Sequence, residues 1–204
     1  MSNQRVPRYR QQDAEKVREY YDVFLASEPG KYSSLEEFSS RYKPVLSFFQ
    51  KMGKCGVKIL DIGCGSGILG LAAALKNDTT VLGCDISLAA IKASVQNAAF
   101  NRMEDRLHLF RGSVDAVSGS FHLVLANLPA AVHMEMFDHY RRLTHPNKGL
   151  LIVSGFDDVQ TVSIEKELTQ RGFMVLERRK IVAWTAALTP EHPFTWVGLG
   201  LKKS

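Results

Sequence analysis

The residues with the clearest chemical potential lie where an apolar run meets a group of glycines. The candidate ligand-binding residues of this stretch are Asp61, Gly63, Cys64, Gly65 and Gly67. Glycines at a strand-to-helix turn let the backbone approach a bound ligand closely. A nicotinamide dinucleotide site would need a further glycine where Ile68 stands. The spacing therefore disfavours a nicotinamide-dependent oxidoreductase, which is kept as a lesser alternative.

A second acidic residue, Asp85, closes the next predicted strand about 20 residues after Gly63. A carboxylate at such a strand end can accept hydrogen bonds from both hydroxyls of a ribose. Ile86 follows it as a further candidate contact. The alternative for Asp85 is a helix-capping role ahead of Ser87. The two motifs together favour a nucleoside-containing ligand.

A third motif, Asn127-Leu128-Pro129, follows the apolar run 121–126. At the end of a parallel strand these residues would lie beside the ligand. An amide oxygen and nearby backbone carbonyls can accept the hydrogens of an amine and hold its nitrogen in line for attack. Ala130 follows and cannot stack on a planar base. The alternative is an ordinary turn, in which Asn and Pro are common.

Asp61 ahead of Gly63, Gly65 and Gly67 resembles the first motif of class I S-adenosylmethionine-dependent methyltransferases. The resemblance implies that Asp61 and the glycine turn hold the methionine end of S-adenosyl-L-methionine and that Asp85 holds its ribose. It also implies that Gly112, Ser113 and Val114 contact the adenine ring. Asn127-Leu128-Pro129 resembles the motif that many N-methyltransferases place beside the methyl group.

Residues 57–188 resemble the catalytic domain of bacterial ribosomal-protein lysine methyltransferases. The resemblance is carried by 61–69, Glu104-Asp105-Arg106, Ala126-Asn127, Ser154-Gly155, Gly172-Phe173, Glu177-Arg178-Arg179 and Trp184. The family's N-terminal recognition domain, and its glycine-, histidine- and threonine-rich segment before the first motif, have no counterpart here. The resemblance implies methylation of a protein nitrogen, with Asn127 and Leu128 orienting the acceptor.

Asn127-Leu128-Pro129 also resembles the corresponding motif of certain transfer-RNA guanine methyltransferases, so an RNA base is an alternative acceptor. A small-molecule acceptor and a non-catalytic cofactor-binding partner subunit are further alternatives.

Short β-rich runs alternate with helical patterns, which predicts an α/β fold with a Rossmann-like, seven-stranded, mostly parallel sheet and helices on both faces. The predicted strands are 57–62, 81–85, 107–110, 121–126, 149–154, 173–182 and 196–201. Predicted helices include 89–100, capped by Ser87, and one from Asp157 to about Gln170 that ends at Gly172.

We expect one methyltransferase domain, 53–204. Residues 1–52 would form a cap of two helices, 13–26 and 35–52, rather than a separate domain. Tyr32, between these helices, would border the acceptor pocket.

The composition is that of an ordinary globular chain of 204 residues, with 45% hydrophobic and 23% charged residues. The polar start lacks a signal sequence, and no apolar run approaches the ~18 residues of a membrane span, so a cytoplasmic location without a membrane is expected. Three cysteines without a C-x-x-C pair and six scattered histidines predict no metal. The net charge of +5 suits a protein or RNA partner, such as one associated with ribosomes. The sequence does not predict the oligomeric state.

Overall fold

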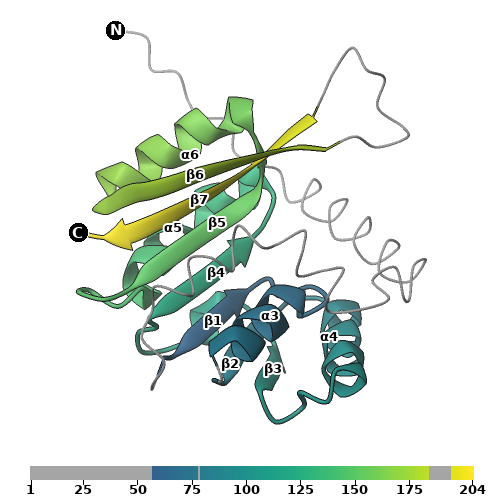
Figure 1. Cartoon of the computed structure of the whole chain (residues 1–204). Coiled ribbons are helices and arrows are strands. Elements are labelled where there is room, and N and C mark those ends of the chain that lie inside the picture. The colour runs from purple at the N-terminus through teal and green to yellow at the C-terminus, as the bar shows by residue number, and fades with distance from the viewer. Residues whose placement is uncertain (1–56, 78, 184–193) are drawn as a thin grey trace, which may run out of the picture.

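The computed structural model describes residues 57–77, 79–183 and 194–204. Seven strands form one sheet in the order β3-β2-β1-β4-β5-β7-β6 (Figure 1). Neighbours from β3 to β5 are parallel, whereas β7 runs antiparallel to both β5 and β6. The strands are β1 Ile59–Ile62, β2 Val81–Asp85, β3 Leu107–Arg111, β4 Leu123–Asn127, β5 Leu150–Asp157, β6 Phe173–Ala183 and β7 Phe194–Lys203. The predicted Rossmann-like α/β fold is confirmed, with strand ends displaced by up to three residues.

The central strands are buried on both faces, which explains their continuous apolar runs. All four residues of β1 are buried. Successive side chains point to opposite faces, so Leu60 and Ile62 join one core cluster with Phe137 and Tyr140. Ile59 joins a second cluster with Leu71 on the other face. Two apolar layers therefore fix the register of the sheet.

In the described part of the chain, four α-helices and one 3-10 turn connect the strands. They are α3 Ile68–Asn77, α4 Leu88–Phe100, η1 Val114–Ala116, α5 Ala130–Leu143 and α6 Asp158–Gln170. The predicted caps are confirmed: Ser87 accepts a hydrogen bond from the Ala90 amide, and Asp157 forms a capping box with Gln160. Gly172 follows α6 with a φ of 81°, as expected at a helix end. Helix α5 was not among the predicted helices. No helix among the described residues is long and apolar enough to cross a membrane.

The chain leaves β1 toward β2 on one side and reaches β4 on the other, so the direction of winding reverses at β1. The carboxyl ends of β1, β2 and β4 therefore meet at one edge, where open α/β sheets bind ligands. The predicted cap of residues 1–52, including Tyr32, lies outside the described residues.

Candidate functional site

A pocket opens at the carboxyl ends of the central strands. It is lined by Ile62, Gly63, Gly65, Cys84, Asp85, Ile86, Ser87, Ala90, Gly112, Ser113, Val114, Asn127, Leu128, Pro129, Val132 and Met136. All three sequence motifs thus contribute to one cavity. Three of the predicted contacts, Asp61, Cys64 and Gly67, are not among its lining residues.

The glycine turn between β1 and α3 is held by backbone hydrogen bonds. Gly63, Gly65 and Gly67 all have positive φ, at 62°, 55° and 76°, a conformation that favours glycine. The Cys64 amide donates to the Cys84 carbonyl at 3.0 Å, and the Gly65 amide donates to Asp85 Oδ2 at 3.0 Å. An added Cβ at Gly65 would have only the Gly63 carbonyl oxygen near it, at 4.0 Å, so this part of the turn leaves room for a ligand.

Helix α4 supports the same turn from behind. Ser94 Oγ donates to the Gly65 carbonyl at 2.8 Å, and Asn97 Nδ2 donates to the Ser66 carbonyl at 2.9 Å. The Cys64 thiol is buried against Ser94, and burial raises its pKa far above the ordinary value. Cys64 is therefore a packing residue and is unsuited to act as a nucleophile.

Asp61 lies beneath the turn and is only 1% exposed. Its Oδ2 accepts a hydrogen bond from the Gly70 amide at 2.9 Å, which anchors the start of α3. Burial raises the pKa of this carboxyl to about 7, against the lowering effect of the Gly70 bond. In this geometry Asp61 shapes the turn from below rather than facing the pocket.

Asp85 lies on the pocket wall with both carboxylate oxygens oriented by the backbone. Oδ1 accepts from the Ser87 amide at 2.8 Å, and Oδ2 accepts from the Gly65 amide at 3.0 Å. Each carboxylate oxygen has a second lone pair that remains for another donor. Two adjacent hydroxyls of a ribose therefore fit this carboxylate. Both readings of Asp85, capping ahead of α4 and ligand binding, are compatible with the geometry.

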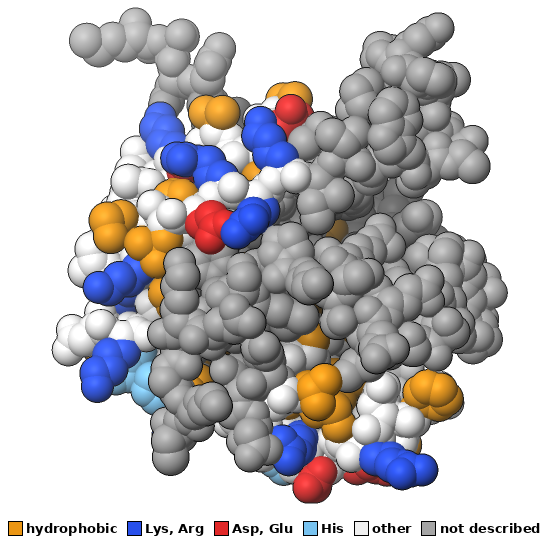
Figure 2. Space-filling model, viewed as in Figure 1, with side chains coloured by type: hydrophobic (Ala, Val, Ile, Leu, Met, Phe, Trp, Pro, Cys, Tyr) orange, Lys and Arg blue, Asp and Glu red, His pale blue; other side chains and the backbone are white. Residues whose placement is uncertain are grey.

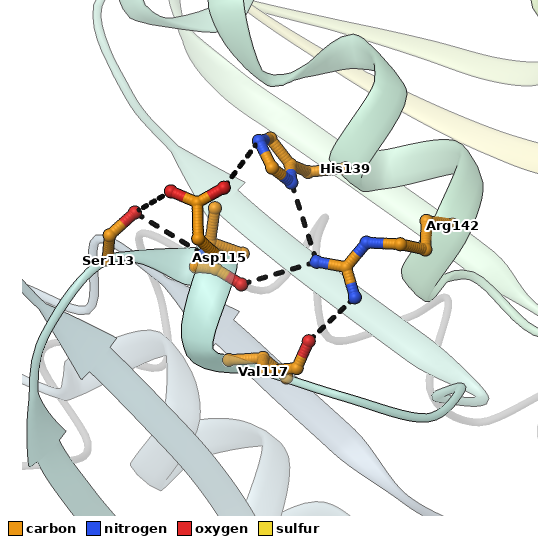
Figure 3. A network of polar contacts seen from close by, with 6 residues as sticks. Ser113, Asp115, Val117, His139 and Arg142 are labelled. Carbon is orange, nitrogen blue, oxygen red and sulfur yellow. Dashed lines mark hydrogen bonds and ion pairs between the residues drawn. The ribbon is translucent and has the colours of Figure 1, made fainter.

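Ser113 and Val114 line another wall of the pocket, and the segment 113–117 is tied to α5 (Figure 3). Arg142 donates from Nη1 to the Val117 carbonyl at 2.6 Å and from Nη2 to the Val114 carbonyl at 3.4 Å. His139 Nε2 lies 3.3 Å from Asp115 Oδ1, and the Ser113 hydroxyl binds the other oxygen of Asp115. Two side chains of α5 thus fix the wall that contains the predicted adenine contacts Ser113 and Val114.

The Asn127-Leu128-Pro129 turn faces the glycine turn across the pocket. The Leu128 side chain fills the space beside Gly63, where an added Cβ would lie 2.4 Å from Leu128 Cδ2. The Leu128 amide donates to the Ser154 carbonyl at 2.9 Å, and Ser154 Oγ donates to Asn127 Oδ1 at 3.1 Å. The end of β5 therefore fixes both the backbone and the amide of this turn.

The sequence of this chain matches that of a known protein family. Residues 43–191 match the profile of the family described as ribosomal protein L11 methyltransferase (PrmA). The chain belongs to the PrmA family. A ribosomal protein L11 methyltransferase from Thermotoga petrophila is 31% identical over 137 residues, which are 67% of this chain and 51% of that protein. The chain thus spans about half the length of this curated PrmA relative.

Solved structures agree with the PrmA assignment. A ribosomal protein L11 methylase from Lactobacillus delbrueckii subsp. bulgaricus superposes with a TM-score of 0.64 at 26% identity, covering 80% of this chain and 79% of that one. Magnesium protoporphyrin IX methyltransferase from Synechocystis PCC 6803, solved with bound SAH, gives a TM-score of 0.71 at 16% identity. That match covers 94% of this chain and 100% of the other, and at this identity it shows a similar fold only.

Several residues of this PrmA-family site had no assigned role from sequence. Ala90, Val132 and Met136 line the pocket, and Ser154 and Gly155 support the turn. Ser154-Gly155 carried the family resemblance, but no local pattern connected it with Asn127. Within the described ranges no group of three or more His, Cys, Asp or Glu side chains is placed to hold a metal ion.

Proposed function

We propose that this PrmA-family chain transfers a methyl group from S-adenosyl-L-methionine to a nitrogen of a ribosomal protein. The observation that carries the proposal is the meeting of three motifs in one pocket, with Asp85 on one wall and Asn127-Leu128-Pro129 on another. The family match supports the reaction class. Residues 53–204 are proposed as the methyltransferase domain.

The residues present fit the cofactor. Asp85 presents two oriented carboxylate oxygens for ribose hydroxyls, and the uncrowded surface at Gly65 suits the methionine part. Ser113 and Val114 would contact the adenine, with Ile86 beside it. When bound, S-adenosyl-L-methionine would supply a methyl group on a sulfonium sulfur, and this sulfur would leave as a neutral thioether.

Positioning is the main contribution that these residues make to the reaction. Asn127 Oδ1 already accepts one hydrogen bond from Ser154, so its second lone pair is available for an N–H of the acceptor. The Leu128 backbone and Pro129 border the same region. Holding the acceptor nitrogen in line with the methyl group converts a collision into an intramolecular step.

A general base is not needed if the acceptor arrives as a free amine. Among the described residues that line the pocket, Asp85 is the only carboxylate. Burial raises the pKa of the Cys84 thiol to about 12, so this group stays protonated at neutral pH. The pocket is therefore suited to an amine that has lost its proton before alignment.

The proposed acceptor is a lysine amine of ribosomal protein L11, met in the cytoplasm on or near ribosomes. Ala130 offers no ring for a nucleobase, and the pocket wall formed by Val132 and Met136 is aliphatic. On the described part of the face in Figure 2, Lys and Arg side chains are spread out, and several lie beside Asp or Glu. Arg178 and Arg179 pair with Glu165 and Glu177, which leaves less free positive charge for RNA.

The test is transfer of radiolabelled methyl from S-adenosyl-L-methionine to purified ribosomal protein L11 and to whole ribosomes, followed by protease or ribonuclease digestion. The proposal predicts protease-sensitive label in both samples. Ribonuclease-sensitive label would favour the RNA alternative. Label in neither sample would favour a small-molecule acceptor or a non-catalytic partner role.

A further inference from the structure

Two polar side chains of α5 are completely buried behind the Asn127-Leu128-Pro129 turn. His133 and Tyr140 are each 0% exposed. His133 Nδ1 lies 2.8 Å from Tyr140 Oη, and His133 Nε2 lies 2.9 Å from the Ser154 carbonyl oxygen. Burying such groups is costly unless every polar atom is paired, so this arrangement needs an explanation.

The partners fix the tautomer of the imidazole. The Ser154 carbonyl can only accept, so His133 Nε2 carries the hydrogen and donates it. Nδ1 of the neutral ring is then an acceptor, and the Tyr140 hydroxyl donates to it. The edge-on ring of Phe156, 5.3 Å away between centroids, packs against the imidazole. The hydrogen-bond direction therefore runs from Tyr140 through His133 to Ser154.

The last acceptor in this series of hydrogen bonds, the Ser154 carbonyl oxygen, also holds the Asn127-Leu128-Pro129 turn. The Ser154 carbonyl accepts from His133 Nε2 and also from the Leu128 amide. Gly155 follows with a φ of 97°, and an added Cβ there would lie 2.4 Å from the Leu128 carbonyl oxygen and 2.9 Å from Asn127 Oδ1. Any shift of the Ser154 peptide would therefore displace the groups proposed to align the acceptor.

The start of α5 gives the same imidazole a second structural task. Pro129 is the N-cap residue and makes no side-chain capping bond. The His133 amide donates to the Pro129 carbonyl at 3.1 Å, while its ring joins the helix to β5. His133 thus ties the first turn of α5 to the strand end that supports Leu128.

We propose that His133, oriented by Tyr140, is a positioning residue for methyl transfer: it fixes the Ser154 peptide and through it the Asn127-Leu128-Pro129 turn. This rests on the proposed function of that turn as the acceptor side. His133 does not touch the pocket, because it is fully buried and both ring nitrogens are bonded. It acts through Leu128 and Asn127 rather than on the reacting atoms.

The first test compares His133→Leu with His133→Gln, whose amide can keep the donor to Ser154. Single-turnover methyl transfer to ribosomal protein L11 should fall at least 100-fold in His133→Leu and no more than about tenfold in His133→Gln. The Kd of S-adenosyl-L-methionine should stay within about threefold of wild type in both. Leu168→Ala is the control, because Leu168 is a fully buried core residue of α6. Its destabilisation should leave transfer by the folded protein unchanged. Wild-type transfer by His133→Leu would overturn the proposal.

A second test needs no acceptor and separates this proposal from the proposed function. Long-range ¹H–¹⁵N spectra of the wild-type protein should show His133 protonated at Nε2 and bare at Nδ1; the opposite tautomer would overturn the proposal. In His133→Leu and Tyr140→Phe, exchange of the Leu128 amide should speed up at least tenfold more than that of Cys64, which serves as the internal control. Equal acceleration at both amides would also overturn it. Absence of transfer by wild type, with these signatures present, would instead count against the proposed function.

Discussion

The two turns that face each other across the pocket are built in different ways. The glycine turn is shaped by three residues with positive φ, by the hydrogen bond that the Gly65 amide donates to Asp85, and by the one that Ser94 of α4 donates to the Gly65 carbonyl. The Asn127-Leu128-Pro129 turn contains no residue with positive φ. It is held by Ser154 and Gly155 at the end of β5. The conformation of the first turn is determined largely by its own residues, whereas that of the second turn is fixed by residues distant in the chain.

This difference predicts separate consequences for binding and for transfer. Changes near Asp85 should weaken the cofactor complex. Changes behind the second turn should leave the cofactor bound but misplace the acceptor, and a displacement of about 1 Å can cost on the order of 100-fold in rate.

Gly155→Ala should reduce methyl transfer about 100-fold while the Kd of S-adenosyl-L-methionine changes less than about threefold. The added Cβ would lie 2.4 Å from the Leu128 carbonyl oxygen, so the turn must move. Gly119→Ala is a matched control, because Gly119 also has positive φ, at 89°, but a Cβ there meets nothing within 4 Å. Single-turnover assays of both variants measure the effect. Equal rates in the two variants would remove the distinction.

Each turn also lies over one buried titratable group, and these two groups respond to pH in opposite senses. Burial raises the pKa of Asp61 to about 7, so its contribution to stability is complete below the unfolded pKa of about 4 and is lost as pH rises through 7. Burial lowers the pKa of His133 to about 4. Its contribution is complete above the unfolded pKa of about 6.5 and is lost as pH falls through 4.

Acidification from about pH 7 to about pH 5 should therefore stabilise the protein through Asp61 and destabilise it through His133, each by about 2 kcal/mol. Relative to wild type over this interval, the unfolding free energy of Asp61→Asn should fall by about 2 kcal/mol. That of His133→Gln should rise by a similar amount. Urea denaturation at both pH values, without cofactor, measures this. Identical pH dependence in all three proteins would contradict the assignment.

Asp85→Asn should raise the Kd of S-adenosyl-L-methionine at least about tenfold, because the hydrogen bonds to a charged acceptor contribute about 1.5–3 kcal/mol each. Asn also offers only one acceptor oxygen to the Gly65 and Ser87 amides. Asp105→Asn, an equal charge change at an exposed position between α4 and β3, is the control. Isothermal calorimetry on both variants gives the comparison. An unaltered Kd in Asp85→Asn would remove Asp85 from the binding site.

Ser94→Ala should destabilise the protein by about 1 kcal/mol, since the Gly65 carbonyl loses its hydrogen-bond donor. The Kd of the cofactor should rise only about two- to threefold, because the glycines still shape the turn. Val95→Ala, at the neighbouring exposed position of α4, is the control. Urea denaturation would show no difference between the two variants if α4 did not support the turn.

Features of the two turns that depend on local sequence could be predicted, whereas those that depend on tertiary packing could not. The positions of the strands along the chain, the glycine turn, Asp85 and the Ser87 and Asp157 caps follow local patterns, and they were predicted. Helix α5 was missed because it follows Pro129 directly without a side-chain cap. Its buried His133 and Tyr140 interrupt the apolar stripe, and their pairing with Ser154 depends on tertiary packing.

Asp61 illustrates a different limit. Its position before the glycines was recognisable, but burial beneath the turn and the bond to Gly70 depend on how α3 packs. The role expected from resemblance, holding the methionine end, stays a prediction. The same applies to Cys64 and Gly67, which shape the turn without lining the pocket.

We propose that one turn holds the cofactor and the other holds the acceptor. The most direct test is calorimetric titration of S-adenosyl-L-methionine into wild type, Asp85→Asn and Gly155→Ala side by side. We expect one site in wild type, a Kd at least about tenfold higher in Asp85→Asn, and a Kd close to wild type in Gly155→Ala. Equal loss of binding in both variants, or no binding to wild type, would contradict it.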